Sequence, residues 1–197
     1  MAEPRELPLF AWADTHLVAL VRRRRRLCGL FFALGAGALG LTIAEPPHPR
    51  LLWNASASAP IGLYRVRPGA SVARGDMVIV WLPTRARALA AARRYLPAKV
   101  PAVKRIAATA GDRVCARGAE LLIGGRVAAE RLAADARGRR MPWWNGCRTL
   151  RPDEIFLLMP ASTTSFDGRY FGISHRTDIV GKATLLWSPA AQGASHD

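Results

Sequence analysis

The chain has 197 residues, of which 50% are hydrophobic, and its formal net charge is +15. This length allows one compact domain with short additional segments, and the hydrophobic content excludes wholesale disorder. The positive charge predicts an anionic partner, either nucleic acid or the head groups of a membrane. Only Lys99, Lys104 and Lys182 are lysines. Because arginine keeps its proton in a protein, any lysine that serves as a base must be one of these three.

The N-terminal part of the chain predicts a membrane anchor. Arg22 to Arg26 form an unbroken basic run, and residues 27–44 carry no charge. About 20 apolar residues match a roughly 30 Å hydrocarbon core, so this segment is short for a spanning helix. The positive-inside rule places the arginines in the cytoplasm. We therefore expect a cytoplasmic basic segment at 1–26, a transmembrane anchor at 27–44 and an exported domain at 45–197.

Two other interpretations of the apolar segment exist. A buried helix of a soluble domain is disfavoured because five arginines would lie at the edge of the core. A cleaved signal peptide would use the small-x-small sequence Thr42-Ile43-Ala44 as its cleavage site. The long polar stretch before the apolar run favours an anchor over a signal peptide. Whether the chain is processed after Ala44 stays open.

The exported part predicts one mostly β domain between about residues 50 and 190. Short β-like runs are separated by the turn signals Gly75-Asp76, Gly111-Asp112 and Gly124-Gly125. Residues 84–95 are rich in Ala and Arg and predict one short helical insertion. The runs that predict strands are 62–66, 77–81, 102–107, 120–123 and 155–159.

One lysine lies within an apolar run. Alternation along a strand would turn Ala102, Lys104 and Ile106 to one face, with Val103 and Arg105 on the other. An inward-facing lysine loses solvation, which lowers its pKa and makes a neutral amine available as a general base. The strand alone, however, favours a surface lysine at a strand edge over a buried one.

A serine-containing loop precedes this strand in the sequence. Small residues surround Ser56 and Ser58, and Pro60 and Gly62 follow. Such a loop lets a peptide backbone approach a hydroxyl group, and a serine hydroxyl activated by a lysine amine is a known variant of nucleophilic catalysis. By itself this loop is weak support for catalysis, since small-residue loops near proline are common.

Three segments in order resemble the conserved boxes of type I signal peptidases. Residues 56–60 resemble the nucleophile box, 103–106 with 110–114 resemble the lysine box and its Gly-Asp turn, and 165–172 resemble the last box. The patterns Ser-x-Pro-x-Gly-Leu-Tyr and Ser-Phe-Asp-x-Arg-Tyr-Phe-Gly are closest to the TraF-type peptidases of conjugative transfer systems. The resemblance covers the anchor and most of residues 50–187.

The resemblance implies a role for each matching residue. Ser58 matches the family nucleophile and Lys104 its general base. Ser56 matches the serine whose hydroxyl, with the backbone N–H of Ser58, stabilises the oxyanion; one such donor typically contributes ~3 kcal/mol. The supporting residues implied by the same match are Ser165, which orients the lysine amine, and the ion pair of Asp167 and Arg169.

The chain also departs from the family pattern. Ala59 stands where signal peptidases often have Met, and Gly168 where the last box often has Ser. Neither position supplies a chemical group to the reaction, and long insertions of some signal peptidases are missing from the sequence. The fold that the resemblance implies is a signal-peptidase-like β-barrel or coiled-sheet catalytic domain behind an N-terminal transmembrane helix.

The cysteines and histidines do not form a metal-binding pattern. The sequence has neither C-x-x-C spacing nor an H-E-x-x-H motif, so we expect no metal and no cofactor. In an oxidising compartment Cys115 and Cys147 could pair. They would close a loop of about 30 residues, which corresponds to ~3 to 4 kcal/mol in the chain-entropy model.

Three classes of function remain for comparison. The first is a membrane-anchored serine endopeptidase of the bacterial inner membrane, with its catalytic domain in the periplasm. Its partners would be a precursor protein with small residues before the cut, the membrane and the conjugation machinery, with no nucleic acid required. Its substrate would be a conjugative pilin precursor, whose product can be cyclised, or another transfer component; a general type I signal peptidase is the alternative.

The other two classes explain less of the sequence. A soluble repressor-type autoprotease shares the serine–lysine chemistry but needs a DNA-binding module where this chain has an apolar segment. A membrane-anchored scaffold that binds nucleic acid would explain the charge, yet the positive-inside arginines already account for much of it, and no aromatic RNA-binding motif occurs.

Overall fold

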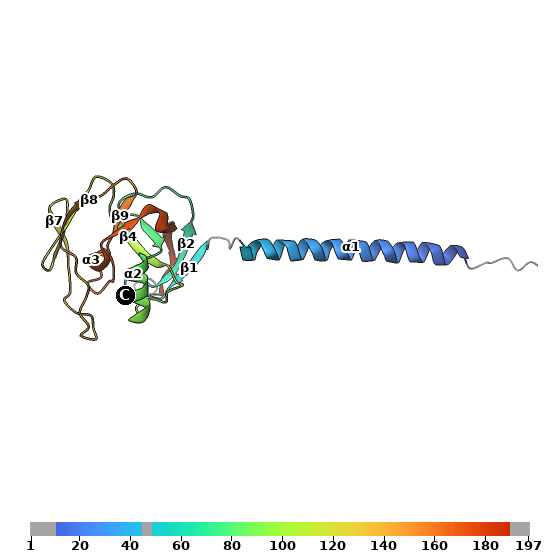
Figure 1. Cartoon of the computed structure of the whole chain (residues 1–197), viewed down its shortest axis with the longest axis horizontal. Helices are drawn as coiled ribbons and strands as arrows, with labels where there is room; N and C mark the ends of the chain where they lie inside the picture. Colours follow the sequence, from blue (N-terminus) through green and yellow to red (C-terminus); the bar gives the residue numbers. More distant parts are fainter. Residues whose placement is uncertain (1–10, 45–48, 190–197) are drawn as a thin grey trace, which may run out of the picture. The chain divides into compact units, whose positions relative to one another are not determined.

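The computed structural model describes residues 11–44 and 49–189 and divides the chain into two compact units, 1–47 and 48–197. Helix α1 (Ala11–Ala44) forms the first unit. The second unit contains all the described strands and two sheets, as Figure 1 shows.

The second unit is built from antiparallel strands in two sheets. The larger sheet has seven strands in the order β1-β2-β11-β3-β4-β9-β10, and the smaller has four in the order β7-β6-β5-β8. In Figure 1 β7 and β8 lie at the opposite end of this unit from β1 and β2. The strands are β1 (Leu51–Asn54), β2 (Gly62–Arg67), β3 (Met77–Val80), β4 (Ala102–Ala108), β5 (Arg113–Arg117), β6 (Glu120–Ile123), β7 (Arg126–Glu130), β8 (Gly146–Thr149), β9 (Glu154–Leu157), β10 (Ile173–His175) and β11 (Ile179–Trp187).

The centre of the larger sheet is covered on both faces. Strand β3 reads Met-Val-Ile-Val and is buried or half-buried throughout, which is typical of a strand between two packed layers. Its partner β4 pairs Val78 with Lys104 and Ile79 with Val103. Ala102, Val103 and Ile106 of β4 lie in three different apolar clusters, and Lys104 shares its strand face with Ala102 and Ile106.

Outer strands of the larger sheet have one solvated face. In β2 the residues Gly62, Tyr64 and Val66 are buried, whereas Arg65 and Arg67 are exposed. This alternation matches the period of two along a strand. It turns Tyr64 and Val66 into the cluster that also contains Val103 and Ala59, next to the serine loop.

The smaller sheet is joined by tight turns and a disulfide. Gly124 and Gly125 connect β6 to β7, and both have positive φ, 57° and 81°. A two-residue hairpin with this geometry favours glycine at both positions, so the Gly-Gly turn signal is explained. Cys115 of β5 and Cys147 of β8 are directly opposite each other and are bridged. The predicted pairing is therefore confirmed.

The predicted helix is present but shorter. Helix α2 (Thr84–Ala92) buries Ala86 and Ala90, and it ends before the expected residue 95. Arg94 has φ 59° and the amide of Tyr95 donates to the carbonyl of Ala90, so the chain turns out of the helix there. Two shorter helical turns that the sequence did not predict are α3 (Gly168–Phe171) and the 3-10 turn η1 (Arg176–Asp178).

The expectation of a mostly β domain is confirmed for the second unit. The predicted strand 120–123 has the observed limits, and three others differ by one residue at their C-terminal end. The predicted strand 155–159 is observed at 154–157, so it differs at both ends. Strands β1, β5, β7, β8, β10 and β11 had not been predicted individually. Several of them carry polar residues on exposed faces, which hides the apolar pattern.

Helix α1 carries large apolar side chains that are exposed in its unit, including Phe31, Phe32 and Leu41. Within the part of the chain that the structure describes, no helix combines the length and apolar character needed to cross a membrane. The segment predicted as an anchor ends with residues 42–44, whose side chains lie outside those described. The transmembrane anchor stays a prediction.

Candidate active site

Ser58 lies in a loop that a buried asparagine holds together. Asn54, the last residue of β1, donates from Nδ2 to the carbonyls of Ser56, Ala59 and Pro60, at 2.9, 3.2 and 3.0 Å. Its Oδ1 accepts from the amide of Ser56 at 3.1 Å. The hydroxyl of Tyr64 also donates to the carbonyl of Pro60. One side chain thus fixes both ends of the serine loop.

The sequence alone does not indicate a role for Asn54. Its partners are backbone carbonyls that approach one another only once the loop has formed. An asparagine directly before a small-residue loop is the local signal that could have indicated it, because Asn side chains readily bond to backbone groups a few residues ahead.

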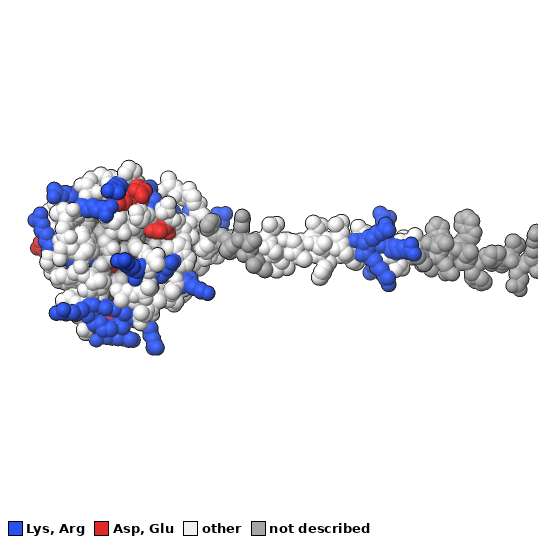
Figure 2. Space-filling view, in the orientation of Figure 1, with Lys and Arg blue, Asp and Glu red and all other residues white. Residues whose placement is uncertain are grey.

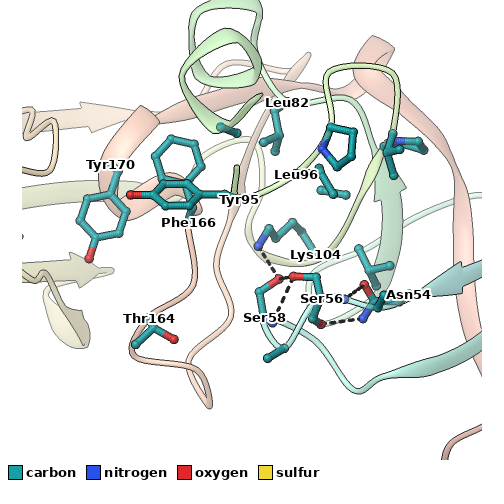
Figure 3. A pocket seen from close by; sticks show the side chains of 18 of the residues that line it. Asn54, Ser56, Ser58, Leu82, Tyr95, Leu96, Lys104, Thr164, Phe166 and Tyr170 are labelled. Carbon is teal, nitrogen blue, oxygen red and sulfur yellow. Dashed lines mark hydrogen bonds between the residues drawn. The ribbon is translucent and has the colours of Figure 1, made fainter. Parts of the chain in front are cut away.

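The side chain of Lys104 extends from β4 to Ser58, which lies in the loop after β1. Its Nζ lies 3.1 Å from the Oγ of Ser58, as Figure 3 shows. The side chain is only 3% exposed, so the prediction that it faces inward is confirmed. Arg105, one residue later in β4, is exposed, as alternation requires.

The surroundings of Lys104 lower its pKa to about 8. Burial is the main cause, because it removes the solvation that stabilises the ammonium form. The charge of Asp167 raises the pKa, and that of Arg169 lowers it. A neutral amine is therefore accessible near physiological pH, which an exposed lysine would not provide.

Ser165 provides a second contact for the amine. Lys104 Nζ lies 2.9 Å from the Oγ of Ser165, a residue that is 1% exposed. The amine is thus held between two hydroxyls on separate loops. When Lys104 is neutral, its N–H groups can donate to Ser165 while its lone pair accepts the proton of Ser58.

Asp167 and Arg169 form a buried ion pair beneath this site. Arg169 Nε donates to Asp167 Oδ1 and Arg169 Nη2 to Oδ2, each at 2.9 Å. The same guanidinium donates to the carbonyls of Met159, Ser162 and Thr163, and Asp167 accepts from the amide of Met159. A fully hydrogen-bonded fork of this kind compensates the cost of burying both charges. The pair fixes residues 159–169 and hence Ser165.

Ser56 lies beside the candidate nucleophile. The hydroxyls of Ser56 and Ser58 are 3.0 Å apart, and the amide of Ser58 donates to Ser56 Oγ at 3.4 Å. Two donors, one backbone N–H and one hydroxyl, therefore converge beside Ser58 Oγ. Such a pair has the composition of an oxyanion site, once both groups turn from each other to a bound substrate.

A cavity of about 550 Å³ opens beside these residues. Ser58 and Lys104 line one part of it, and Figure 3 shows Tyr95, Phe166 and Tyr170 around another part. Most of the remaining lining is aliphatic, and it comes from β1 and the serine loop, from residues 96–103 and from residues 132–141. A polypeptide bound at Ser58 would therefore have side chains facing an apolar cavity.

The site contains side chains of the acyl-transfer type rather than metal ligands. Among residues 19–41 and 49–189, no three His, Cys, Asp or Glu side chains gather as a metal site would require. A hydroxyl within 3.1 Å of an amine with a lowered pKa can act as a nucleophile with its general base. All six predicted site residues, Ser56, Ser58, Lys104, Ser165, Asp167 and Arg169, lie at or directly beneath this site.

Comparison with known protein families identifies the class of protein to which the chain belongs. The sequence model of the family "Signal peptidase, peptidase S26" matches residues 24–188, which is most of the chain. The chain therefore belongs to the signal peptidase family, peptidase S26. This is a family of serine endopeptidases, so the protein is a serine peptidase that processes exported proteins.

One relative shows which type of signal peptidase the chain resembles. Plasmid transfer protein TraF of Escherichia coli is 29% identical over 170 residues, which are 80% of this chain and 95% of the relative. The predicted resemblance to TraF-type signal peptidases is thereby confirmed. A crystal structure of signal peptidase I from Enterococcus faecalis V583 aligns at 19% identity with a TM-score of 0.34, covering 58% of this chain and 98% of that one.

Proposed function

We propose that Ser58 is the nucleophile and Lys104 the general base of this serine endopeptidase. The observation that carries the proposal is the 3.1 Å contact between Ser58 Oγ and the buried Nζ of Lys104. The lowered pKa of Lys104 supports it, because only the neutral amine accepts a proton. The matching order of the three sequence boxes supports it independently.

The reaction is acyl transfer in two stages. Ser58 Oγ attacks the scissile carbonyl carbon while its proton passes to Lys104 Nζ. The resulting oxyanion accepts hydrogen bonds from the amide of Ser58 and the hydroxyl of Ser56. The C–N bond then breaks, and the Lys104 ammonium returns its proton to the leaving amine. An ester between Ser58 and the acyl part of the precursor remains.

The second stage releases the acyl part. The neutral Lys104 takes a proton from a water molecule that attacks the ester carbonyl, and Ser58 Oγ leaves with that proton. If an amine of the precursor attacks instead, the product is a cyclic peptide. Ser165 keeps the amine directed at Ser58 in both stages, and the pair of Asp167 and Arg169 holds Ser165 in place.

We propose a conjugative pilin precursor, or another exported transfer component, as the substrate. The likeness to plasmid transfer protein TraF supports this choice over a general type I signal peptidase. The resemblance to the family implies small residues at the first and third positions before the cut. Cyclisation would follow when the amine of the same precursor lies closer to the ester than water.

The proposed location is the bacterial inner membrane, with residues 27–44 as the anchor and the peptidase unit in the periplasm. The uncharged segment after Arg22 to Arg26 supports this orientation. The exposed Phe31 and Phe32 support it too, because large apolar side chains need an apolar environment. The Cys115–Cys147 bridge is compatible with an oxidising compartment.

The test is cleavage of a pilin precursor by the full chain in detergent. Ser58→Ala and Lys104→Ala should each lower the rate by roughly a thousandfold or more, since they remove the nucleophile or its base. Ser71→Ala and Lys99→Ala are matched controls on exposed residues and should cleave normally. Normal cleavage by either site variant would refute the dyad. A product one water lighter than the hydrolysed one would identify cyclisation.

A further inference from the structure

The cavity beside Ser58 is much larger than a small side chain requires. It measures about 550 Å³, within the range of pockets that hold drug-sized ligands. The alanine side chain is a single methyl group. One such methyl group would fill only a small part of this cavity.

The walls of the cavity are preformed. Leu82, Phe166 and Tyr170 line it and belong to one buried cluster, with 4–8% of each exposed. The rings of Phe166 and Tyr170 are stacked with centroids 6.0 Å apart, and Tyr95 packs against Phe166 at 5.5 Å. Because these side chains are packed against one another, the cavity does not depend on a ligand to open.

Two alanines create part of the space. Ala90 on α2 is 1% exposed, Ala102 on β4 is 6% exposed, and both line the cavity. Ala102 lies on the same strand face as Lys104, two residues earlier. A larger side chain at either position would occupy volume within the cavity.

The polar groups at the far wall are already paired. The hydroxyl of Tyr95 donates to the carboxylate of Asp135, which also accepts from Arg139 Nε at 2.7 Å and from the amides of Arg137 and Arg139 at 2.9 Å. These contacts lower the pKa of Asp135, with the Tyr95 bond as the largest cause. A polar substrate side chain would therefore find few free partners there, whereas an apolar one would gain contact area.

We propose that this cavity binds a bulky apolar side chain, between leucine and phenylalanine in size, within a few residues of the cut in the precursor. Each buried methylene adds favourable transfer free energy in such an environment. Small residues then remain a requirement only at the positions nearest the scissile bond. This inference rests on the proposed peptidase function and specifies its substrate.

The test is cleavage-site profiling with the full chain in detergent. The probe is a proteome-derived peptide library, whose new ends are sequenced by mass spectrometry, with Ser58→Ala as the background. The expected result is one position near the cut at which Leu, Met or Phe exceeds Ala by about tenfold, the discrimination that even one methylene can give. Enrichment of only Ala, Gly and Ser at every position would overturn the inference.

Two variants locate the preference in this cavity. Ala90→Leu should abolish the enrichment, whereas Ala88→Leu on the exposed face of the same helix should keep it. Leu96→Ala enlarges the cavity and should move the preference from Leu toward Phe, which provides a result even if Ala90→Leu misfolds. An unchanged profile in Leu96→Ala, or in a folded Ala90→Leu variant, would contradict the proposal.

The outcomes also separate this inference from the function on which it rests. A library without any Ser58-dependent cut would overturn the peptidase proposal and the inference together. Ser58-dependent cuts that lack a bulky apolar preference would overturn the inference alone.

Discussion

Lys104 obtains its unusual properties from its position in β4 and from two flanking loops. Ser58 and Ser165 contact its amine at 3.1 and 2.9 Å, and neither is near it in sequence. Burial lowers the pKa of the amine, so that more of it is neutral and able to accept a proton near neutral pH, while the two hydroxyls determine where its lone pair points. Burial is thus the main cause of the lowered pKa, and Ser165 acts on both the direction and the pKa of the amine.

Ser165→Ala tests the directional part. The variant removes the hydroxyl oxygen that accepts from Lys104, so kcat should fall by roughly 10- to 100-fold with little change in KM. Because that oxygen favours the ammonium form, the acid limb of the rate profile should also move to lower pH. Ser162→Ala, which leaves the backbone carbonyl that binds Arg169 intact, is the control. An unaltered kcat and pH profile in Ser165→Ala would show that Ser165 does not position the amine.

The sequence could predict Lys104 and, through the family resemblance, the pair of Asp167 and Arg169, but not the contacts by which Asn54 and this pair hold the two loops. Alternation in residues 102–107 is a local pattern, and only three lysines were available. The role of Asn54 depends instead on carbonyls brought together by the turn before Pro60. The spacing of Asp167 and Arg169 likewise does not reveal that the guanidinium of Arg169 also donates to the backbone carbonyls of Met159, Ser162 and Thr163.

At the scale of elements, the short helix α3 connects the ion pair to the core. Asp167 precedes the helix and its carboxylate accepts from the amide of Arg169. Gly168 begins it, at a point where a Cβ atom would come 2.6 Å from the ring of Phe156 and 2.7 Å from the carbonyl oxygen of Leu157. This close approach explains why glycine stands where the last box of signal peptidases often has serine.

Gly168→Ser should therefore destabilise this protein although it restores the common family residue. The displaced ring and backbone should cost about 1–3 kcal/mol in the free energy of unfolding, measured in urea. Activity should fall as well, because residues 165–169 would shift. Ala161→Ser, on an exposed position of the same region, is the control. Equal stability of Gly168→Ser and the parent chain would contradict the packing argument.

Elements with a strong local pattern were predictable, and those that depend on pairing were not. Strands 120–123 and 102–107 stand out as apolar runs, and Gly124-Gly125 marks the hairpin that follows the strand at 120–123. Strand β8 is exposed along its length, so only its pairing with β5 and the bridge at Cys147 define it. The end of α2 depends on the positive φ of Arg94, which composition alone does not indicate.

At the scale of the whole molecule, the charge is spread over both units. Figure 2 shows Lys and Arg side chains on the visible face of the peptidase unit and in a band on α1. Several acidic groups are paired with basic ones, among them Asp76 with Lys182 and Glu154 with Arg148. Each such pair is neutral, so the net charge of +15 comes from the other basic side chains. Much of this charge is available to anionic surfaces such as lipid head groups.

Removal of residues 1–47 tests the division of roles between the units. The remaining unit contains its own apolar clusters and the whole candidate site, so it should fold and cleave a soluble peptide. Its co-sedimentation with vesicles that contain anionic lipid should be at least about tenfold weaker than that of the full chain, because an apolar anchor binds lipid far more strongly than a charged surface. Equal sedimentation of both forms would contradict the proposed anchor.

The central claim is that Lys104, held at a pKa of about 8, is the base that activates Ser58. The most direct measurement is the pH dependence of kcat/KM for one peptide substrate, since it reports the free enzyme. Below this pKa Lys104 carries a proton and cannot accept another, so the rate should rise through a single inflection near pH 8 and then level off. An inflection near about 6.5, as for an ordinary histidine, or a rate independent of pH between about 7 and 9, would contradict it.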